Sequence, residues 1–254
     1  MYLYDASALA IAGEIRRPTQ QVIENQASTC LAMTGGVSRA EVAGFHVPGI
    51  VSFRRAFAEV SGSSEASSIH HTGANVVVEG LNVLDIITAD RVIARLYGRH
   101  SPKEVESRVG ANGTHFENLR IAGQSVQIEL ATGLLDRYDT FAELDAAYSR
   151  SPHEFDRFLF GSRRKSLKPD ASDLYHISLA EKVVLPSNLG TKVHGCTIEI
   201  PNFGKVYIGE LFIQKSRRRL NMLRFELGSP VAGRLLIASA SCNGLAGDSG
   251  TPDD

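Results

Sequence analysis

Two segments of the chain resemble each other without a gap. Residues 42–62 read VAGFHVPGIVSFRRAFAEVSG, and residues 78–98 read VEGLNVLDIITADRVIARLYG, 36 residues further on (78 − 42 = 36). Seven pairs are identical: Val42/Val78, Gly44/Gly80, Val47/Val83, Ile50/Ile86, Arg55/Arg91, Ala58/Ala94 and Gly62/Gly98. A weaker third copy begins at Phe116. Repeats near this length typically encode a supersecondary unit that stacks on its neighbours, although two β-rich segments can also resemble each other by chance.

Both segments predict extended structure. In the second, the short run around Gly80 predicts a strand that bends at this glycine. The following run, from Ile86 to Tyr97, alternates only imperfectly between apolar and polar residues, which predicts a strand partly covered on both faces. A helix would also suit the letters ADRVIARLYG. The corresponding run of the first segment, with Val51 and Phe53, favours a strand.

The segments on either side differ in how clearly they predict strands. We expect a strand over Tyr2–Ala12 that ends at Gly13, followed mostly by loop over residues 14–36. Near the other end, several short strands separated by turn residues are predicted between Val193 and Ala240.

A helical insertion interrupts the β pattern. Hydrophobic residues at three-to-four spacing predict one amphipathic helix of about four turns over residues 134–148. A second, short helix is predicted from Pro152 to Phe160, with the proline in its first turn.

These elements predict a mainly β fold: an antiparallel sandwich, or a solenoid-like stack of repeated strand units, with a small helical insertion. The 254 residues, 43% of them hydrophobic, suffice for a single β-rich domain over residues 1–254. We place the insertion at about residues 131–172. The small, polar residues at about 244–254 form a tail that we expect to be flexible or held only by a partner.

Charge and hydropathy exclude some classes of partner. The net charge of −1 gives no general attraction to nucleic acid or anionic lipid, so a nucleic-acid partner is not expected. No apolar stretch approaches the roughly 20 residues of a membrane-spanning helix, so we expect a soluble protein. The N-terminus lacks the pattern of a secretory signal: either the chain is not exported by that route or the signal has been removed.

The three cysteines, Cys30, Cys196 and Cys242, are too far apart in sequence to indicate a metal knuckle. One bridge between Cys196 and Cys242 is conceivable, but three buried thiols are the favoured interpretation.

Several histidines and carboxylates have the side-chain chemistry of metal ligands. Adjacent strand residues point to opposite faces, so His70 and His71, with His100 and His115, are interpreted as surface or loop histidines. Asp136, Asp139, Glu143 and Asp145 lack the spacing of a calcium-binding loop and are interpreted as a solvated helix face. We therefore predict no catalytic, cofactor-binding or metal-binding residues, and no cofactor.

Two basic runs are the candidate partner contacts. The first is Arg163, Arg164 and Lys165, after the predicted helices. The second is Arg217, Arg218 and Arg219, between two predicted strands. The second run could grip a phosphate or a carboxylate, but a charged hairpin tip is the simpler interpretation.

Four stretches together resemble the choice-of-anchor P family: VEGLNVLDIITADRVIAR, FENLRIAGQSV, IEIPNFGKVYIGE, and LRFELG with LLIASASC. The similarity extends over about residues 37–242, apart from the insertion, and departs from the family pattern at Gly209, where the pattern has Asn. The resemblance implies a bacterial secreted or surface β protein of unknown activity, located outside the cell. It supplies no catalytic residues.

Three functions follow from these observations. The first is a non-enzymatic structural or surface assembly protein that associates with itself, because β-rich chains with exposed edges readily pair with other chains. The second is a module that binds a glycan or another surface protein through the insertion and loops. The third is a hydrolase without a sequence motif, such as a glycosidase that uses two carboxylates.

Overall fold

The computed structural model describes residues 2–65, 68–158, 174–186, 190–215 and 217–243, and most of them form antiparallel β-strands. The first eight-stranded sheet, sheet A, has β14 (Lys192–His194), β15 (Thr197–Ile200), β16 (Gly204–Ile213), β17 (Arg217–Leu227), β18 (Ala232–Asn243), β1 (Ala6–Arg17) and β2 (Gln21–Cys30) in spatial order, and β12 (Tyr175–Ser178) also pairs with β16. The second, sheet B, has β10 (Gln124–Ser125), β9 (Arg120–Ile121), β6 (Ile87–His100), β5 (His70–Val83), β4 (Val51–Ser64) and β3 (Gly36–Val47), and β7 (Arg108–Gly110) and β8 (His115–Glu117) also pair with β6. A small third sheet pairs β11 (Gln127–Leu130) with β13 (Ala180–Val184).

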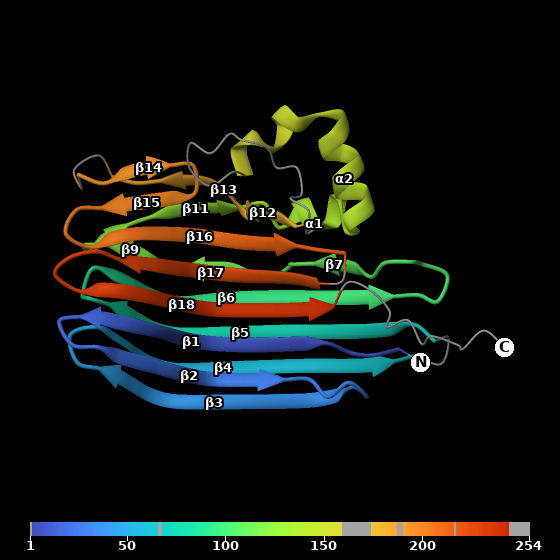
Figure 1. The fold of residues 1–254 in the computed structure, drawn as a ribbon, viewed down its shortest axis with the longest axis horizontal. Coiled ribbons are helices and arrows are strands. Elements are labelled where there is room, and N and C mark those ends of the chain that lie inside the picture. Colours follow the sequence, from blue (N-terminus) through green and yellow to red (C-terminus); the bar gives the residue numbers. More distant parts are fainter. Residues whose placement is uncertain (1, 66–67, 159–173, 187–189, 216, 244–254) are drawn as a thin grey trace.

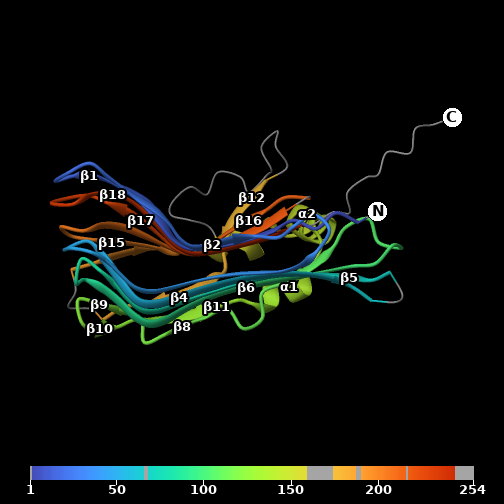
Figure 2. The ribbon, with the colours of Figure 1, turned by 90° about the horizontal axis from the view of Figure 1, so that it is seen from below.

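The two large sheets pack face to face as a sandwich, and the helices lie at one end of it (Figures 1 and 2). Between the sheets lies a core rich in Ala, Val and Ile. Sheet A joins distant parts of the chain, because β1 pairs with β18 in a register that places Ala8 opposite Ala240. The predicted mainly β fold is confirmed. Of the two predicted architectures, the structure has the antiparallel sandwich and not the solenoid-like stack.

The two similar segments lie in adjacent hairpins of sheet B with matching geometry. Residues 42–62 belong to the β3–β4 hairpin and residues 78–98 to the β5–β6 hairpin. In both turns an isoleucine N–H, that of Ile50 or Ile86, donates to a valine carbonyl at 3.0 Å. Gly44 and Gly80 both have positive φ, +70° and +64°. Residues 87–98 are therefore strand, as predicted, and not helix, and Ile86 belongs to the turn before them.

A transverse crease crosses both sheets at the level of these glycines. Every second strand has a residue with positive φ in one row: Gly44 and Gly80 in sheet B, then Gly209, Ala238 and Ala27 in sheet A. The strands between them carry Arg54 and Asp90 in sheet B, and Met222 and Ala10 in sheet A, at the same level. Both layers bend together here, toward the outer side of sheet A (Figure 2). Positive φ bends the strand locally, so the row folds each sheet along a line.

The crease also reverses the side-chain alternation. In β4, the buried residues are Val51 and Phe53 before the crease but Ala56 and Ala58 after it, with the exposed Arg54 in between. In β6, Ala89 is followed by Val92 in the same way. The imperfect alternation of Ile86–Tyr97 thus reflects a change of parity within one strand, rather than partial covering of both faces.

The N-terminal region corrects a prediction. Residues 14–36 are not mostly loop, because β1 continues to Arg17 and β2 follows at Gln21–Cys30. As an edge strand, β2 buries few side chains, among them Ile23 and Ala27, so its sequence lacks a clear hydrophobic alternation.

The helical insertion contains two helices where one was predicted over 134–148. They are α1 (Gly133–Arg137) and α2 (Phe141–Arg150), followed by a 3-10 helix, η1 (Pro152–Phe158). The break occurs because Thr140 has extended backbone and its hydroxyl accepts a hydrogen bond from Glu143 N at 3.2 Å, which starts a new helix. The tail at 244–254 lies outside the described residues. No helix in the described ranges has the length and hydropathy to cross a membrane.

Two glycines of the crease provide a matched test of its geometry. A Cβ on Gly80 would lie 3.0 Å from Arg54 Cβ, whereas a Cβ on Gly44, in the edge strand, would meet no atom within 4 Å. Both positions have positive φ, so Gly44→Ala should cost about 1 kcal/mol of stability and Gly80→Ala about 2–3 kcal/mol. Urea unfolding of the two variants measures the difference. Equal costs would contradict close packing across the crease.

Candidate functional site

The structure describes one of the two predicted basic runs. Arg163, Arg164 and Lys165 lie outside the described residues. The other run, Arg217–Arg219, begins β17, and Arg217 closes the β16–β17 turn through backbone hydrogen bonds with Gln214, so the run starts at the hairpin tip as predicted and continues into the strand. Its side chains alternate between the two faces of sheet A. Arg217 pairs with Asp5 at 3.2 Å, and the Arg219 guanidinium lies 4.7 Å from the centre of the Phe212 ring.

Arg218 points the other way, into the end of the sandwich, and is 1% exposed. Its Nη1 donates to the carbonyl oxygens of Gln214 and Arg217. Its Nη2 lies 3.9 Å from Glu106 Oε2 without a hydrogen bond. Burial lowers the pKa of Arg218 to about 10 and raises the pKa of the neighbouring Cys242 thiol to about 12.

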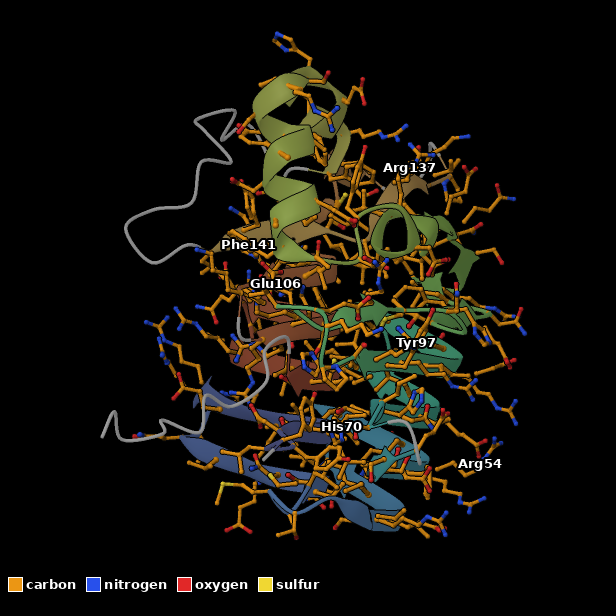
Figure 3. All side chains as sticks on the ribbon, turned by 90° about the vertical axis from the view of Figure 1, so that its right-hand side faces the viewer. Arg54, His70, Tyr97, Glu106, Arg137 and Phe141 are labelled. Atoms are coloured by element: carbon orange, nitrogen blue, oxygen red, sulfur yellow. The ribbon has the colours of Figure 1, made fainter. Side chains whose placement is uncertain are left out.

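Glu106 links this buried arginine to the helical insertion. Its Oε2 accepts the N–H of Phe141, the first residue of α2, at 2.6 Å, where the helix dipole favours a negative charge. Asp139, next to α2, pairs with Arg108 of β7 at 3.0 Å. Burial raises the pKa of Asp139 in spite of the hydrogen bond from Arg108 that lowers it. Figure 3 looks at this end, with Glu106 beside Phe141. The carboxylates of Glu106 and Asp139 thus hold the helical insertion against the sandwich.

An aromatic and imidazole cluster lies beside these charges. The Tyr2 ring stacks between His70 and His100, with centroid distances of 4.2 and 5.1 Å, and Tyr4 Oη lies 2.9 Å from His70 Nδ1. Burial, together with the proximity of the other imidazole, lowers the pKa of His100. The interpretation of these histidines as surface residues is wrong for His100, which is buried, and holds for the exposed His71 and His115.

Buried polar atoms without a hydrogen-bond partner concentrate at this same end. Within the described ranges they are Thr72 Oγ1, His100 Nδ1, Glu104 Oε2, Asp139 Oδ1 and Arg218 Nη2. Such atoms lose hydration on folding without full compensation, so this end carries an unfavourable contribution that the core must offset.

The predicted solvated helix face is only partly solvated. Asp139 is paired inside as described above, Asp145 accepts a hydrogen bond from Tyr175, and Asp136 accepts one from Tyr97 at 3.2 Å. Each of these carboxylates contacts a residue of another element, so they hold the insertion in place. In the residues that the structure describes, no group of three or more potential ligands could hold a metal ion.

The cysteines are all reduced and unpaired, including Cys196 and Cys242. The favoured prediction of buried thiols holds for these two and is wrong for Cys30, which is exposed on the edge strand β2.

A second buried carboxylate, Glu210, organises the outer face of sheet A beside the crease. It is 1% exposed and accepts hydrogen bonds from Arg224, from Asn221 at 3.0 Å and from His176 at 2.9 Å. Burial by itself raises the pKa of Glu210, but the hydrogen bonds from His176 and Arg224 outweigh it and lower the pKa to about 2. Asn221 in turn accepts from Ser239, so the network ties β16, β17 and β18 together.

The outer face of sheet B is the open surface of the sandwich. Across β4, β5, β6 and β8, the strand registers align a charged row, whose members are Arg55, Glu79, Arg91 and Glu117. Their signs alternate. Arg91 lies 3.1 Å from Glu79 and 3.5 Å from Glu117, whereas Arg55 pairs with Glu41 of β3 at 2.7 Å. Cross-strand pairs of opposite charge stabilise a sheet.

An apolar row lies directly beside this charged row. It consists of the half-buried Phe57 and Val77 and of Ile93, which is only 6% exposed, and it runs from Glu41 on β3 to His115 on β8. A shallow hollow lies over it, lined by Arg55, Phe57, Val77 and Glu79. A mixed row, with Arg39, Glu59, Asn75 and Arg95, lies on its other side. Sequence reasoning did not find this face, because the rows combine residues from strands that are far apart in sequence.

A second hollow continues this face toward the helical end. It is lined in part by Gly73, Asn75, Arg95, Tyr97 and Asn112. The Tyr97 hydroxyl donates to Asp136 and accepts from Asn112 at 3.1 Å. Tyr97 lies on the sheet B side of the end view in Figure 3. The surface is therefore open and polar here, with one aromatic ring.

Fold and surface together define an antiparallel β-sandwich with one open, mixed-charge sheet face and a helical insertion docked at one end. The model of one protein family, described as Domain of unknown function (DUF8256), matches residues 2–174, and the chain belongs to this family. No curated protein and no solved structure matches the chain significantly. The resemblance to the choice-of-anchor P family stays a prediction. The matched segment includes β1, whose partner β18 lies outside it, so the segment shares sheet A with the rest of the chain.

The buried ion pair at the helical end should respond asymmetrically to mutation. Glu106→Ala leaves the Arg218 charge buried without its counter-charge and removes the acceptor for Phe141 N–H, so we expect a loss of about 3–5 kcal/mol. Arg218→Met removes the buried charge itself, so its loss of stability should be smaller than that of Glu106→Ala. Glu129→Ala, in an exposed pair with Lys182, is the control and should cost under about 1 kcal/mol. Chemical denaturation measures all three. A Glu106→Ala cost no larger than the control would refute the assignment.

The Glu210 network should make stability depend on pH. The folded pKa of about 2 lies below the ordinary 4.5, so the stabilisation is complete above about pH 5 and disappears as the pH falls toward 2. At pH 7 we expect Glu210→Gln to be less stable than the native chain by about 3 kcal/mol. The difference in unfolding free energy between Glu210→Gln and the native chain should decrease steadily as the pH falls. Unfolding free energies between pH 7 and pH 3 test this, with Glu14→Gln as control, because the Glu14 side chain on β1 is 46% exposed. A gap that stays constant with pH would contradict the role of the Glu210 charge.

Proposed function

We propose that the protein is a non-enzymatic structural module that associates with itself through the outer face of sheet B. The observation that carries the proposal is the arrangement of rows on this face. The half-buried Phe57 and Val77, with the buried Ile93 beside them, form an apolar row between rows of charged and polar residues. Apolar area at the centre with polar residues around it is the usual anatomy of a protein–protein contact.

The charges on this face favour a protein surface that resembles it. Arg55 and Arg91 alternate with Glu79 and Glu117 along one row, so no single sign prevails there. Nucleic acid or an anionic lipid surface would require an excess of positive charge. A second surface with alternating charges can place an opposite charge against each member of the row.

The sheet edges are less suited to association than the face. On the same side of the sandwich, β2 and β3 are the last strands of their sheets (Figure 1). Each is interrupted by a residue with positive φ, Ala27 or Gly44. The side chains of β3 include the charged Arg39 and Glu41. Irregular backbone and charges are devices that block strand addition at an edge, so association through the open face is favoured over pairing of edges.

Substitution at the centre of the face tests the proposal. Val77→Glu places a charge in the apolar row and should weaken self-association at least about tenfold. Val22→Glu, on the 70% exposed side chain of the β2 edge, is the matched control and should leave association unchanged. Sedimentation velocity over a range of concentrations gives the association constants, and thermal unfolding verifies that both variants fold. A native chain that remains monomeric at high concentration would overturn the proposal.

A further inference from the structure

We infer that the self-association is a two-fold contact in which two sheet B faces stack with their strands running in the same direction, around an axis that lies parallel to the strands between β5 and β6. This inference rests on the proposed function. It adds the identity of the partner, a second copy of this chain, and the pairing of rows across the contact.

The charged row is complementary to itself under this rotation. From β4 to β8 its signs are plus, minus, plus, minus, at Arg55, Glu79, Arg91 and Glu117. A two-fold axis along the strands keeps each row at its own level and reverses its order. Arg55 then faces the partner's Glu117, and Glu79 faces the partner's Arg91. Every member of the row meets an opposite charge, as an isologous contact requires.

The two adjacent rows fit the same axis. In the apolar row, Val77 of β5 faces the partner's Ile93, and Phe57 faces the partner's His115. In the mixed row, Asn75 of β5 faces the partner's Arg95, an amide against a guanidinium. At the centre, the half-buried Val77 therefore lies over the partner's Ile93, whose exposed fraction in the free chain is 6%, and no like charges oppose each other across β5 and β6.

The other simple way to stack the two faces is less favourable. A two-fold axis across the strands, along the apolar row, would exchange the charged row with the mixed row. It would place Arg55 opposite the partner's Glu59, but it would also place Arg91 opposite the partner's Arg95, because both arginines lie on β6 at equal distance from Ile93. Like charges directly opposed in an interface are repulsive. The row pattern thus selects the axis along the strands.

A charge exchange tests the pairing. Arg55→Glu creates two like-charge contacts with the partner's Glu117 by symmetry, and we expect the association constant to fall at least about tenfold. The double variant Arg55→Glu with Glu117→Arg restores opposite charges across the contact, while it breaks the Arg55–Glu41 and Arg91–Glu117 pairs within each copy. It should recover most of the lost association, and thermal unfolding of the double variant verifies that it folds. Arg16→Glu, in the exposed Arg16–Glu14 pair of sheet A, is the charge-matched control and should have no effect. Failure of the double variant to recover would count against the pairing.

A distance measurement separates the two axes independently. The variant His71→Cys is made in a Cys30→Ser background, so that the buried Cys196 and Cys242 are the only other thiols. A spin label at position 71 then lies on the outer face of sheet B, near the start of β5. With the axis along the strands, the two labels lie on nearby strands of stacked sheets, roughly 10–25 Å apart. With the axis across the strands, the two labels lie on opposite sides of the apolar row. Each is six residues, or about 20 Å, from Val77 along the strand, so the labels are about 40 Å apart.

The outcomes distinguish the two proposals. A short distance together with recovery of the double variant supports the two-fold contact. Association with labels about 40 Å apart and no recovery overturns this contact while the proposed self-association stands. A monomeric native chain overturns both.

Discussion

The row of positive-φ residues that creases both sheets is the constraint on which the rest of the structure depends. Gly44, Gly80, Gly209, Ala238 and Ala27 alternate with ordinary strand residues across the two layers. In each strand the crease separates two segments of opposite parity, so it decides which side chains enter the core. Both layers must bend at the same level and in the same direction, because otherwise the sheets could not stay in contact along their length.

The two sides of the crease are chemically different. On the outer side of sheet A, toward which the layers bend, the row consists of buried small or apolar residues, and the buried Glu210 binds three side chains next to it. On the outer side of sheet B, the row includes the exposed Arg54 and Asp90. The concave side is thus closed by its own polar network, whereas the convex side presents charges. This difference leaves sheet B as the face open to a partner.

Sequence reasoning predicted the mainly β content, the strands of both similar segments and the bend at Gly80, because alternation and glycine report on local backbone. It failed where tertiary contacts decide. Arg218 has the same strand parity as the buried Leu220, which indicates that its side chain enters the core. The run of three arginines concealed this indication, because such a run is typical of a solvent-exposed turn. The α1–α2 break had a local signal in Thr140 and Glu143, which the hydrophobic spacing concealed. The edge strand β2 had almost no signal, because a strand with one partner and a largely exposed surface needs few apolar residues.

The sequence by itself determined that the chain is mainly β, that two hairpins share one pattern and that helices interrupt the strands, because these depend on contacts between near neighbours in the chain. Only the tertiary structure decided that β1 pairs with β18, that Glu106 meets both Arg218 and the start of α2, and that Arg55, Glu79, Arg91 and Glu117 form one row. Strand order and register bring these residues together across tens of positions, and no local pattern encodes which strands become neighbours.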